Sequence, residues 1–197
     1  MGLSTNQAEI SPPLEVPPSD EQLVAAAQHA LPAFEHLYRR HVNEVYRYCA
    51  RRLSSEMDAA DATSVVFTRA LTNIRSCQPA SFRPWLYTIA RNVVVDHYRS
   101  ARPSEVIDEA HDIADQALGP EELTIQSDQR RTVERAMTNL PEGERSVIEL
   151  RLAGLSAVEI AAALGKTRNA IDQAQFRAIA HLSELLAPSN QPTGASR

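Results

Sequence analysis

Apolar residues recur at steps of three and four along most of this chain, and that spacing is typical of helices packed through one face. The clearest run lies between residues 34 and 53, where one helical face collects Phe34, Leu37, Tyr38, Val42, Val45, Cys49 and Leu53. Similar spacing occurs at about residues 59–74, 81–102 and 133–182. Aromatic residues make up only 5% of the sequence, which disfavours a large β-sandwich with an aromatic core. The chain is therefore predicted to be all-α.

Charge is distributed unevenly along the 197 residues, and this indicates two domains. The formal net charge is −5, yet residues 34–102 hold eleven Arg against six acidic residues. Residues 104–128 hold eight acidic residues and no Lys or Arg. Blocks of unlike charge suggest different partners. The predicted organisation is a disordered tail over 1–19, a helical domain over 20–102, an acidic flexible linker over 103–129, a helical domain over 130–186 and a disordered tail over 187–197.

The segment from Ser81 to Arg102 is informative when it is wound as a helix. Its predicted buried stripe consists of Leu86, Ile89, Ala90, Val93 and His97. The opposite side collects Arg91, Asn92, Arg99 and Arg102. Three arginines and an asparagine on one face could contact phosphates and bases. The alternative is the solvated face of an ordinary surface helix.

A helix-turn-helix pattern occupies the C-terminal domain. Ser156 with Glu159 forms a capping box, Gly165 suits a tight turn that needs a positive φ, and Thr167 caps a second helix. That helix turns Ile171, Ala174, Ala178 and Leu182 inward and leaves Asn169, Asp172, Gln173, Phe176 and Arg177 outside. Such a helix can enter the major groove, with Arg168 and Lys166 holding phosphates. The alternative is an ordinary three-helix core.

Other classes of function find little support in the sequence. It contains no nucleophile elbow, glycine-rich phosphate loop or metal-ligand spacing, so no catalytic residue, metal site or cofactor is expected. Cys49 and Cys77 are expected to be two reduced thiols, with a redox switch as the alternative. No stretch of about 20 apolar residues occurs, and the N-terminus lacks a signal peptide pattern. We therefore expect a cytoplasmic protein without membrane insertion.

Four segments in this order resemble the sigma-70 family of RNA polymerase sigma factors, in the extracytoplasmic-function (ECF) group. They are FEHLYRRHVNEVYRYCARRL, DAADATSVVFTRAL, SFRPWLYTIARNVVVDHYR and NLPEGERSVIELRLAGLSAVEIAAALGKTRNAI. The resemblance implies an N-terminal sigma domain two and a C-terminal helix-turn-helix sigma domain four, joined by the acidic linker. It also implies core RNA polymerase and promoter DNA as partners, with an anti-sigma factor as a further expected partner.

The resemblance further implies roles for individual residues. Core polymerase would be bound by Asp61, Ser64, Phe67 and Arg69. The −10 element would be contacted by Asn73, Trp85, Arg91, Asn92, Arg99 and Arg102. For Trp85 the alternative is a packing role. The −35 element would be read by Arg168, Asn169, Asp172, Gln173, Phe176 and Arg177. The alternative function is a helix-turn-helix regulator that binds an operator without core polymerase.

Overall fold

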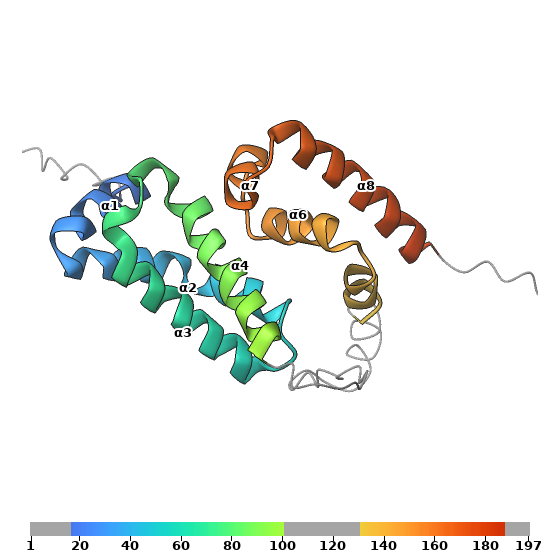
Figure 1. The fold of residues 1–197 in the computed structure, drawn as a ribbon, viewed down its shortest axis with the longest axis horizontal. Coiled ribbons are helices and arrows are strands. Elements are labelled where there is room, and N and C mark those ends of the chain that lie inside the picture. The colour runs from blue at the N-terminus through green and yellow to red at the C-terminus, as the bar shows by residue number, and fades with distance from the viewer. Residues whose placement is uncertain (1–16, 101–130, 188–197) are drawn as a thin grey trace, which may run out of the picture.

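The computed structural model describes residues 17–100 and 131–187, and these contain helices and no strands. The N-terminal part contains α1 (Asp20–His29), α2 (Phe34–Ala50), α3 (Glu56–Asn73) and α4 (Phe82–Ser100) (Figure 1). The C-terminal part contains a helix over residues 131–138, then α6 (Glu142–Leu152), α7 (Ala157–Leu164) and α8 (Arg168–Leu186). The all-α prediction is confirmed for these residues. The predicted linker lies outside the described residues, as do the predicted tails apart from residues 17–19 and 187.

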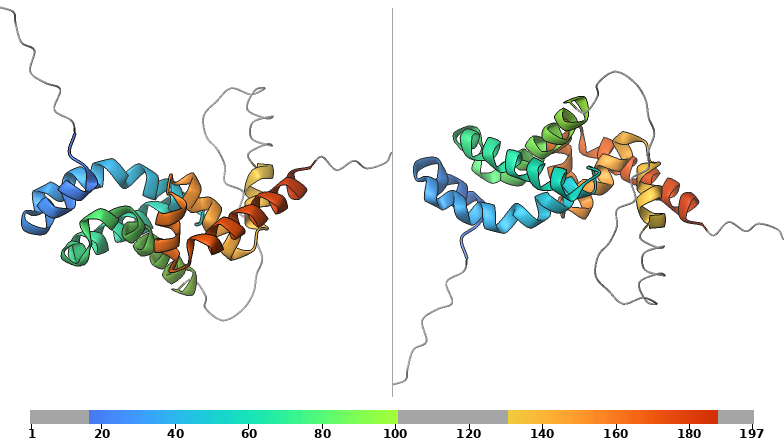
Figure 2. Two further views of the ribbon diagram at one scale, coloured as in Figure 1. Left: turned by 90° about the horizontal axis from the view of Figure 1, so that it is seen from above. Right: turned by 90° about the horizontal axis from the view of Figure 1, so that it is seen from below.

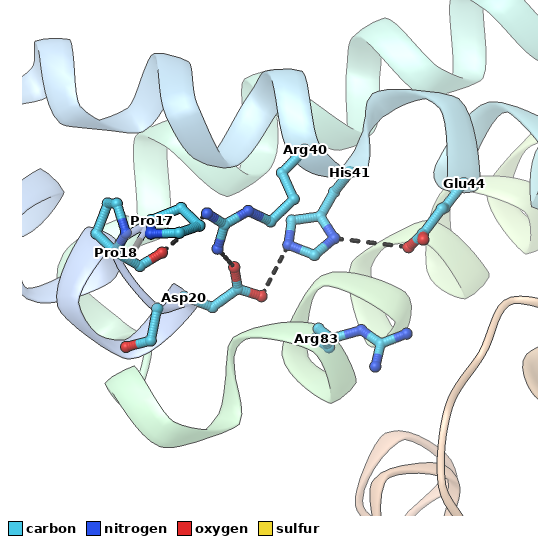
Figure 3. Close-up of a pocket in the computed structure, with 8 residues that line it drawn as sticks. Pro17, Pro18, Asp20, Arg40, His41, Glu44 and Arg83 are labelled. Atoms are coloured by element: carbon cyan, nitrogen blue, oxygen red, sulfur yellow. Dashed lines mark hydrogen bonds and ion pairs between the residues drawn. The ribbon is translucent and has the colours of Figure 1, made fainter. Parts of the chain in front are cut away.

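The N-terminal end of helix α1 is stabilised by a capping box and by contacts between its first turn and α2. Ser19 and Gln22 form a capping box at its N-terminus. Asp20 accepts a hydrogen bond from Arg40 at 2.6 Å, and its other oxygen lies 2.8 Å from Nε2 of the buried His41 (Figure 3). These contacts tie the start of α1 to the middle of α2. The open hollow drawn in Figure 3 is therefore lined by side chains that hold two helices together.

Helices α2 and α3 pack through most of the apolar residues that their spacing predicts, but Tyr38 is 43% exposed and Val42 is half-buried, while Tyr48, outside the predicted stripe, is buried. Leu37, Val45 and Cys49 of α2 are fully buried. Helix α3 begins at Glu56, three residues before the predicted start, because Ser55 caps it by accepting a hydrogen bond from the Asp58 amide. The predicted loop over 75–81 contains two short 3-10 turns, Ile74–Ser76 and Pro79–Ser81.

Helix α4 lies between the other N-terminal helices and the C-terminal part (Figure 1). Leu86, Ala90 and Val93 are buried as predicted, whereas Ile89 and His97 are only half-buried. The buried set of α4 also includes residues that the predicted stripe omitted: Phe82, Pro84, Tyr87 and Val94. The buried surface is wider than one stripe because α3 and α7 pack against α4 from different sides.

The helix-turn-helix geometry agrees with the sequence prediction in its caps and its turn. Ser156 and Glu159 form the capping box of α7, and the hydroxyl of Thr167 accepts a hydrogen bond from the Ala170 amide. Gly165 ends α7 with a φ of 61°, in the left-handed region. Ile171, Ala174 and Ala178 are buried, while Leu182 is half-buried. The inward and outward faces of α8 are therefore those predicted.

The two helical parts share one continuous apolar core, which the sequence analysis did not anticipate. Buried residues of α2, α3 and α4 form a single cluster with those of α6, α7 and α8. Helix α7 packs directly on α4, where the Thr88 hydroxyl lies 3.2 Å from the Ala163 carbonyl oxygen. In both views of Figure 2, α6–α8 lie at one end of the N-terminal helices. The parts are thus in contact rather than separated.

Candidate nucleic-acid interface

The N-terminal half of α8 presents a continuous exposed polar face. All six side chains that were predicted to read DNA are exposed: Arg168, Asn169, Asp172, Gln173, Phe176 and Arg177. Phe176 is 77% exposed and adds an apolar ring to this otherwise polar face. The buried residues Ile171 and Ala174 fix the rotation of the helix, so this face points away from the core.

Ion pairs order the charged residues of this α8 face. Arg168 and Asp172 pair at 3.7 Å on successive turns, and both side chains remain more than half exposed. Arg177 pairs with the buried Glu144 of α6 at 3.2 Å. Asn169 and Gln173 carry the amide groups that can form paired hydrogen bonds with adenine. The α8 face therefore combines exposed side-chain amides with arginines that are held in ion pairs.

A second exposed face lies on α4. Arg91, Asn92 and Arg99 are exposed on this helix, while Arg102 lies outside the described residues. Trp85 is half-buried in the first turn of α4, with its ring 6.1 Å from that of Phe82. Asn73 is exposed at the end of α3, where its amide donates to the Arg69 carbonyl at 2.8 Å. The predicted residues therefore come from α4 and from the C-terminal end of α3.

The residues predicted to bind polymerase divide into an exposed and a buried group. Asp61, Ser64 and Arg69 are exposed on α3. Arg69 also pairs with Asp96 of α4 at 3.0 Å. Phe67 is only 5% exposed, and its ring packs edge-on against those of Phe34 and Tyr38. Its position agrees with the helical spacing, which placed it inward, and a direct contact of Phe67 with polymerase stays a prediction.

The described part of the chain has neither a candidate metal site nor a helix able to span a membrane. Residues 17–100 and 131–187 contain no group of three or more His, Cys, Asp or Glu side chains that could hold a metal ion. Within the same ranges, no helix has the length and apolarity needed to cross a bilayer. The exposed faces of α8 and α4 are therefore the candidate functional surfaces of the described residues.

Comparison with known proteins connects these faces to a family. Residues 37–103 match the family described as Sigma-70 region 2, and residues 130–182 match Sigma-70, region 4. The chain belongs to the sigma-70 family. Region 2 thus covers α2 to α4, and region 4 covers the helix-turn-helix.

Similar proteins place this sigma factor in the ECF group. It is 36% identical over 159 residues to the ECF RNA polymerase sigma factor BldN of Streptomyces coelicolor, a match that covers 78% of this chain and 60% of BldN. It is 33% identical over 152 residues to the ECF sigma factor SigD of Mycobacterium tuberculosis, covering 71% and 70%. Among solved structures, CnrH in complex with the cytosolic domain of CnrY is similar, with a TM-score of 0.67 and 28% identity over 85% of this chain and 96% of that one.

The sequence analysis missed a group of charged residues where region 2 of this sigma factor meets region 4. Arg52 follows α2, and its guanidinium contacts Glu142, Ser146 and Glu149 of α6. Burial disfavours the charge of Arg52 and is the largest single effect, but Glu149, Tyr48 and Glu142 together outweigh it and raise the Arg52 pKa. Burial tends to raise the pKa of Glu142, but the hydrogen bond and charge of Arg52, the hydrogen bond from Ser146 and the charge of Arg145 together hold that pKa below its ordinary value. No local pattern signals these contacts, because their partners are 90 or more residues apart.

Proposed function

We propose that this chain binds core RNA polymerase, directs it to promoters with −10 and −35 elements, and promotes DNA opening for transcription initiation. One observation carries the proposal: region 2 and region 4 occur in one chain, and each has an exposed face of side chains suited to nucleic acid. Tethering of both faces to polymerase removes the need for strong DNA affinity in either region. The chain acts as an initiation factor in the cytoplasm and not as an enzyme.

Region 4 reads the −35 element through α8 in the major groove. Asn169 and Gln173 pair with adenines, and Asp172 accepts from the amino group of cytosine. Phe176 contacts a thymine methyl group. Arg168 and Arg177 lie at the two ends of this face and contact phosphates. The exposure of all of these side chains supports this assignment.

Region 2 contacts the −10 element and the polymerase through neighbouring helices. Arg91, Asn92, Arg99 and Arg102 contact the −10 region. Asn73 borders the pocket for an extruded base, and Trp85 lies beside the melted step. On α3, core polymerase is bound by Asp61, Ser64 and Arg69, whose exposure supports this role. The Arg69–Asp96 pair links the polymerase-binding helix to the DNA-binding helix.

An anti-sigma factor is a further partner in this proposal. CnrH, a similar protein of known structure, is in complex with the cytosolic domain of CnrY. The alternative function, an operator-binding regulator that works without polymerase, explains the helix-turn-helix only. It leaves the match to region 2 and the exposed arginines of α4 without a role.

The test is binding of the purified chain to sigma-free core RNA polymerase, followed by transcription from fragmented host DNA. Co-elution with core and discrete start sites are expected, and alignment of those start sites yields both promoter elements. Tight operator binding by the free chain without core binding would instead identify a simple regulator.

A further inference from the structure

Residues 74–81 join α3 to α4 and form a short segment that contains two 3-10 turns. Ile74 and Cys77 are buried in this segment, whereas Arg75 and Gln78 are exposed. The Cys77 amide donates to the Ile74 carbonyl at 3.1 Å, which closes the first turn. The segment therefore has an inner side fixed in the core and an outer side that carries polar side chains. We call it the 74–81 segment.

One side chain of α1 binds the backbone on this inner side. Gln28 lies one residue before the end of α1 and is half-buried. Its Nε2 donates to the Cys77 carbonyl at 2.7 Å and to the Ile74 carbonyl at 3.2 Å. A glutamine amide nitrogen carries two hydrogens, so a single side chain can satisfy both carbonyls. Because Ile74 directly follows α3, its carbonyl lacks a partner within that helix and needs one from elsewhere.

Helix α1 is itself anchored, so Gln28 is attached to a rigid element. The helix packs against both 3-10 turns of the 74–81 segment and buries Leu23, Val24 and Ala27 (Figure 1). At its other end, Asp20 binds two side chains of α2. The match to Sigma-70 region 2 begins only at residue 37. The donor that holds the 74–81 segment therefore comes from a helix outside the matched region.

The two carbonyls that Gln28 binds enclose the part of the segment nearest to Asn73. Arg75 and Ser76 lie between Ile74 and Cys77 in the sequence, and the Ser76 hydroxyl donates to the Asn73 carbonyl at 2.8 Å. Without the Gln28 amide, two carbonyls of buried residues lose a donor, and leaving such groups unpaired is unfavourable. The turn can regain hydrogen bonds only by moving toward water. That movement displaces the exposed side chains that the turn carries.

We propose that Gln28 is a positioning residue for recognition of the −10 element, and that it holds Asn73 and the 74–81 segment in the conformation that receives an extruded base. This inference rests on the proposed function of region 2 and deepens it. Gln28 acts through the backbone of the segment and not by touching DNA. A pocket selects one base over another only when its walls are held in place by surrounding contacts. Loss of the Gln28 amide therefore lowers base discrimination at −10.

The first test is amide hydrogen exchange in the free full-length chain. Gln28→Met keeps the length of the side chain and removes both donors, whereas Gln28→Glu keeps its shape but faces two acceptors with a third. Exchange at the Cys77 amide is expected to be roughly ten-fold faster in Gln28→Met and faster still in Gln28→Glu. The matched control is His29→Met, at the neighbouring exposed position of α1, which should leave this exchange unchanged. Unchanged exchange in both Gln28 variants would overturn the proposal.

The second test uses polymerase reconstituted with each variant. Opening is measured by 2-aminopurine fluorescence on the promoter found by start-site alignment and on versions with single base changes in the −10 element. The ratio of these rates is expected to fall about five-fold in Gln28→Met, while binding to core polymerase remains unchanged.

A purely structural role for Gln28 predicts a different result in this second test. Opening would then fall equally on all the promoters, and an unchanged ratio would overturn the positioning role. Failure of the unmodified chain to bind core polymerase or to open any promoter would instead reject the proposed function. The exchange data on the free chain would still show whether Gln28 holds the 74–81 segment.

Discussion

Arg177 of α8 donates a hydrogen bond from Nε to Glu144 of α6 at 3.2 Å. The second oxygen of Glu144 lies 2.7 Å from Nδ1 of His181, one turn further along α8. Glu144 is only 6% exposed, so its carboxylate is held between two side chains of α8 at the edge of the core. This carboxylate links α6 to α8 at two positions and thereby helps to set where the exposed face of α8 points.

Replacement of Glu144 by Ala is expected to lower the free energy of unfolding by about 1 kcal/mol. This decrease in the free energy of unfolding is near the low end of the range for a broken hydrogen bond to a charged group. The reason is that Arg177 is more than half exposed and can bind water instead. Urea denaturation measures it. The control is Asn169→Ala, which should leave stability within about 0.5 kcal/mol but weaken −35 binding by about 1–3 kcal/mol. Equal stability of Glu144→Ala and the unmodified chain would contradict the positioning role.

The arginines of α4 give a prediction about promoter opening. Arg91→Ala or Arg99→Ala is expected to reduce opening by about 1–3 kcal/mol, because each removes a charged contact to DNA. Binding to core polymerase should remain nearly intact. Permanganate reactivity of unpaired thymines measures opening, and co-elution measures core binding. Arg39→Ala serves as the control, since it removes an exposed arginine from α2.

Loss of core binding in the Arg91 or Arg99 variants would reverse this assignment. It would mean that the exposed face of α4 contacts polymerase and that another face meets DNA. A steep salt dependence of opening, reduced in the variants, would support phosphate contacts by these two side chains.

Much of this fold follows from local sequence signals. The capping box of Ser156 and Glu159 places the start of α7, and Gly165 places the turn that follows it. Each signal acts within four residues, so its effect does not depend on the rest of the chain. The exposed face of α8 follows in turn from the spacing of Ile171, Ala174 and Ala178.

Contacts between distant segments could not be predicted in this way. Arg52 and Glu149 are 97 residues apart, and an arginine beside a run of apolar residues looks like any surface charge. The burial of Tyr87 and Val94 has the same origin, because helical spacing describes one stripe while α4 is covered from two sides. The contact between region 2 and region 4 therefore could not be predicted from the sequence and follows only from the three-dimensional structure.

The two thiols are expected to be inert in the folded protein. Burial raises the pKa of Cys49 to about 11, although its hydrogen bond with Thr63 and the charge of Arg51 oppose the shift. Burial likewise raises the pKa of Cys77 to about 11. At neutral pH both groups are protonated, and the thiolate is the reactive form. Ellman's reagent should thus react slowly with the native chain and release two equivalents in denaturant.

These pKa values also predict how stability changes at alkaline pH. Between the ordinary thiol pKa of 9.0 and about 11, the unfolded chain has lost thiol protons that the folded chain keeps. The free energy of unfolding therefore falls as pH rises through this window, and the contribution is fully present below it. A Cys49→Ala, Cys77→Ala variant should show a shallower decline, measured by urea denaturation between pH 8 and about 11. In the experiment with Ellman's reagent, rapid reaction of the native chain would contradict the burial of both thiols, because it would mean that one thiol is accessible.

Two glycines allow the same substitution to be tested with opposite expected signs. Gly165 has a φ of 61°, and an added Cβ would meet no atom within 4 Å, so Gly165→Ala carries a cost from backbone conformation alone. We expect it to lower the free energy of unfolding by roughly 1–2 kcal/mol. Gly143 lies in the first turn of α6, where an added Cβ would make only an ordinary contact with Lys166. Gly143→Ala should therefore raise stability by about 0.5–1 kcal/mol, because alanine loses less freedom in a helix. Urea denaturation of both variants measures the difference, and equal stabilities would show that the turn after α7 does not require the left-handed conformation.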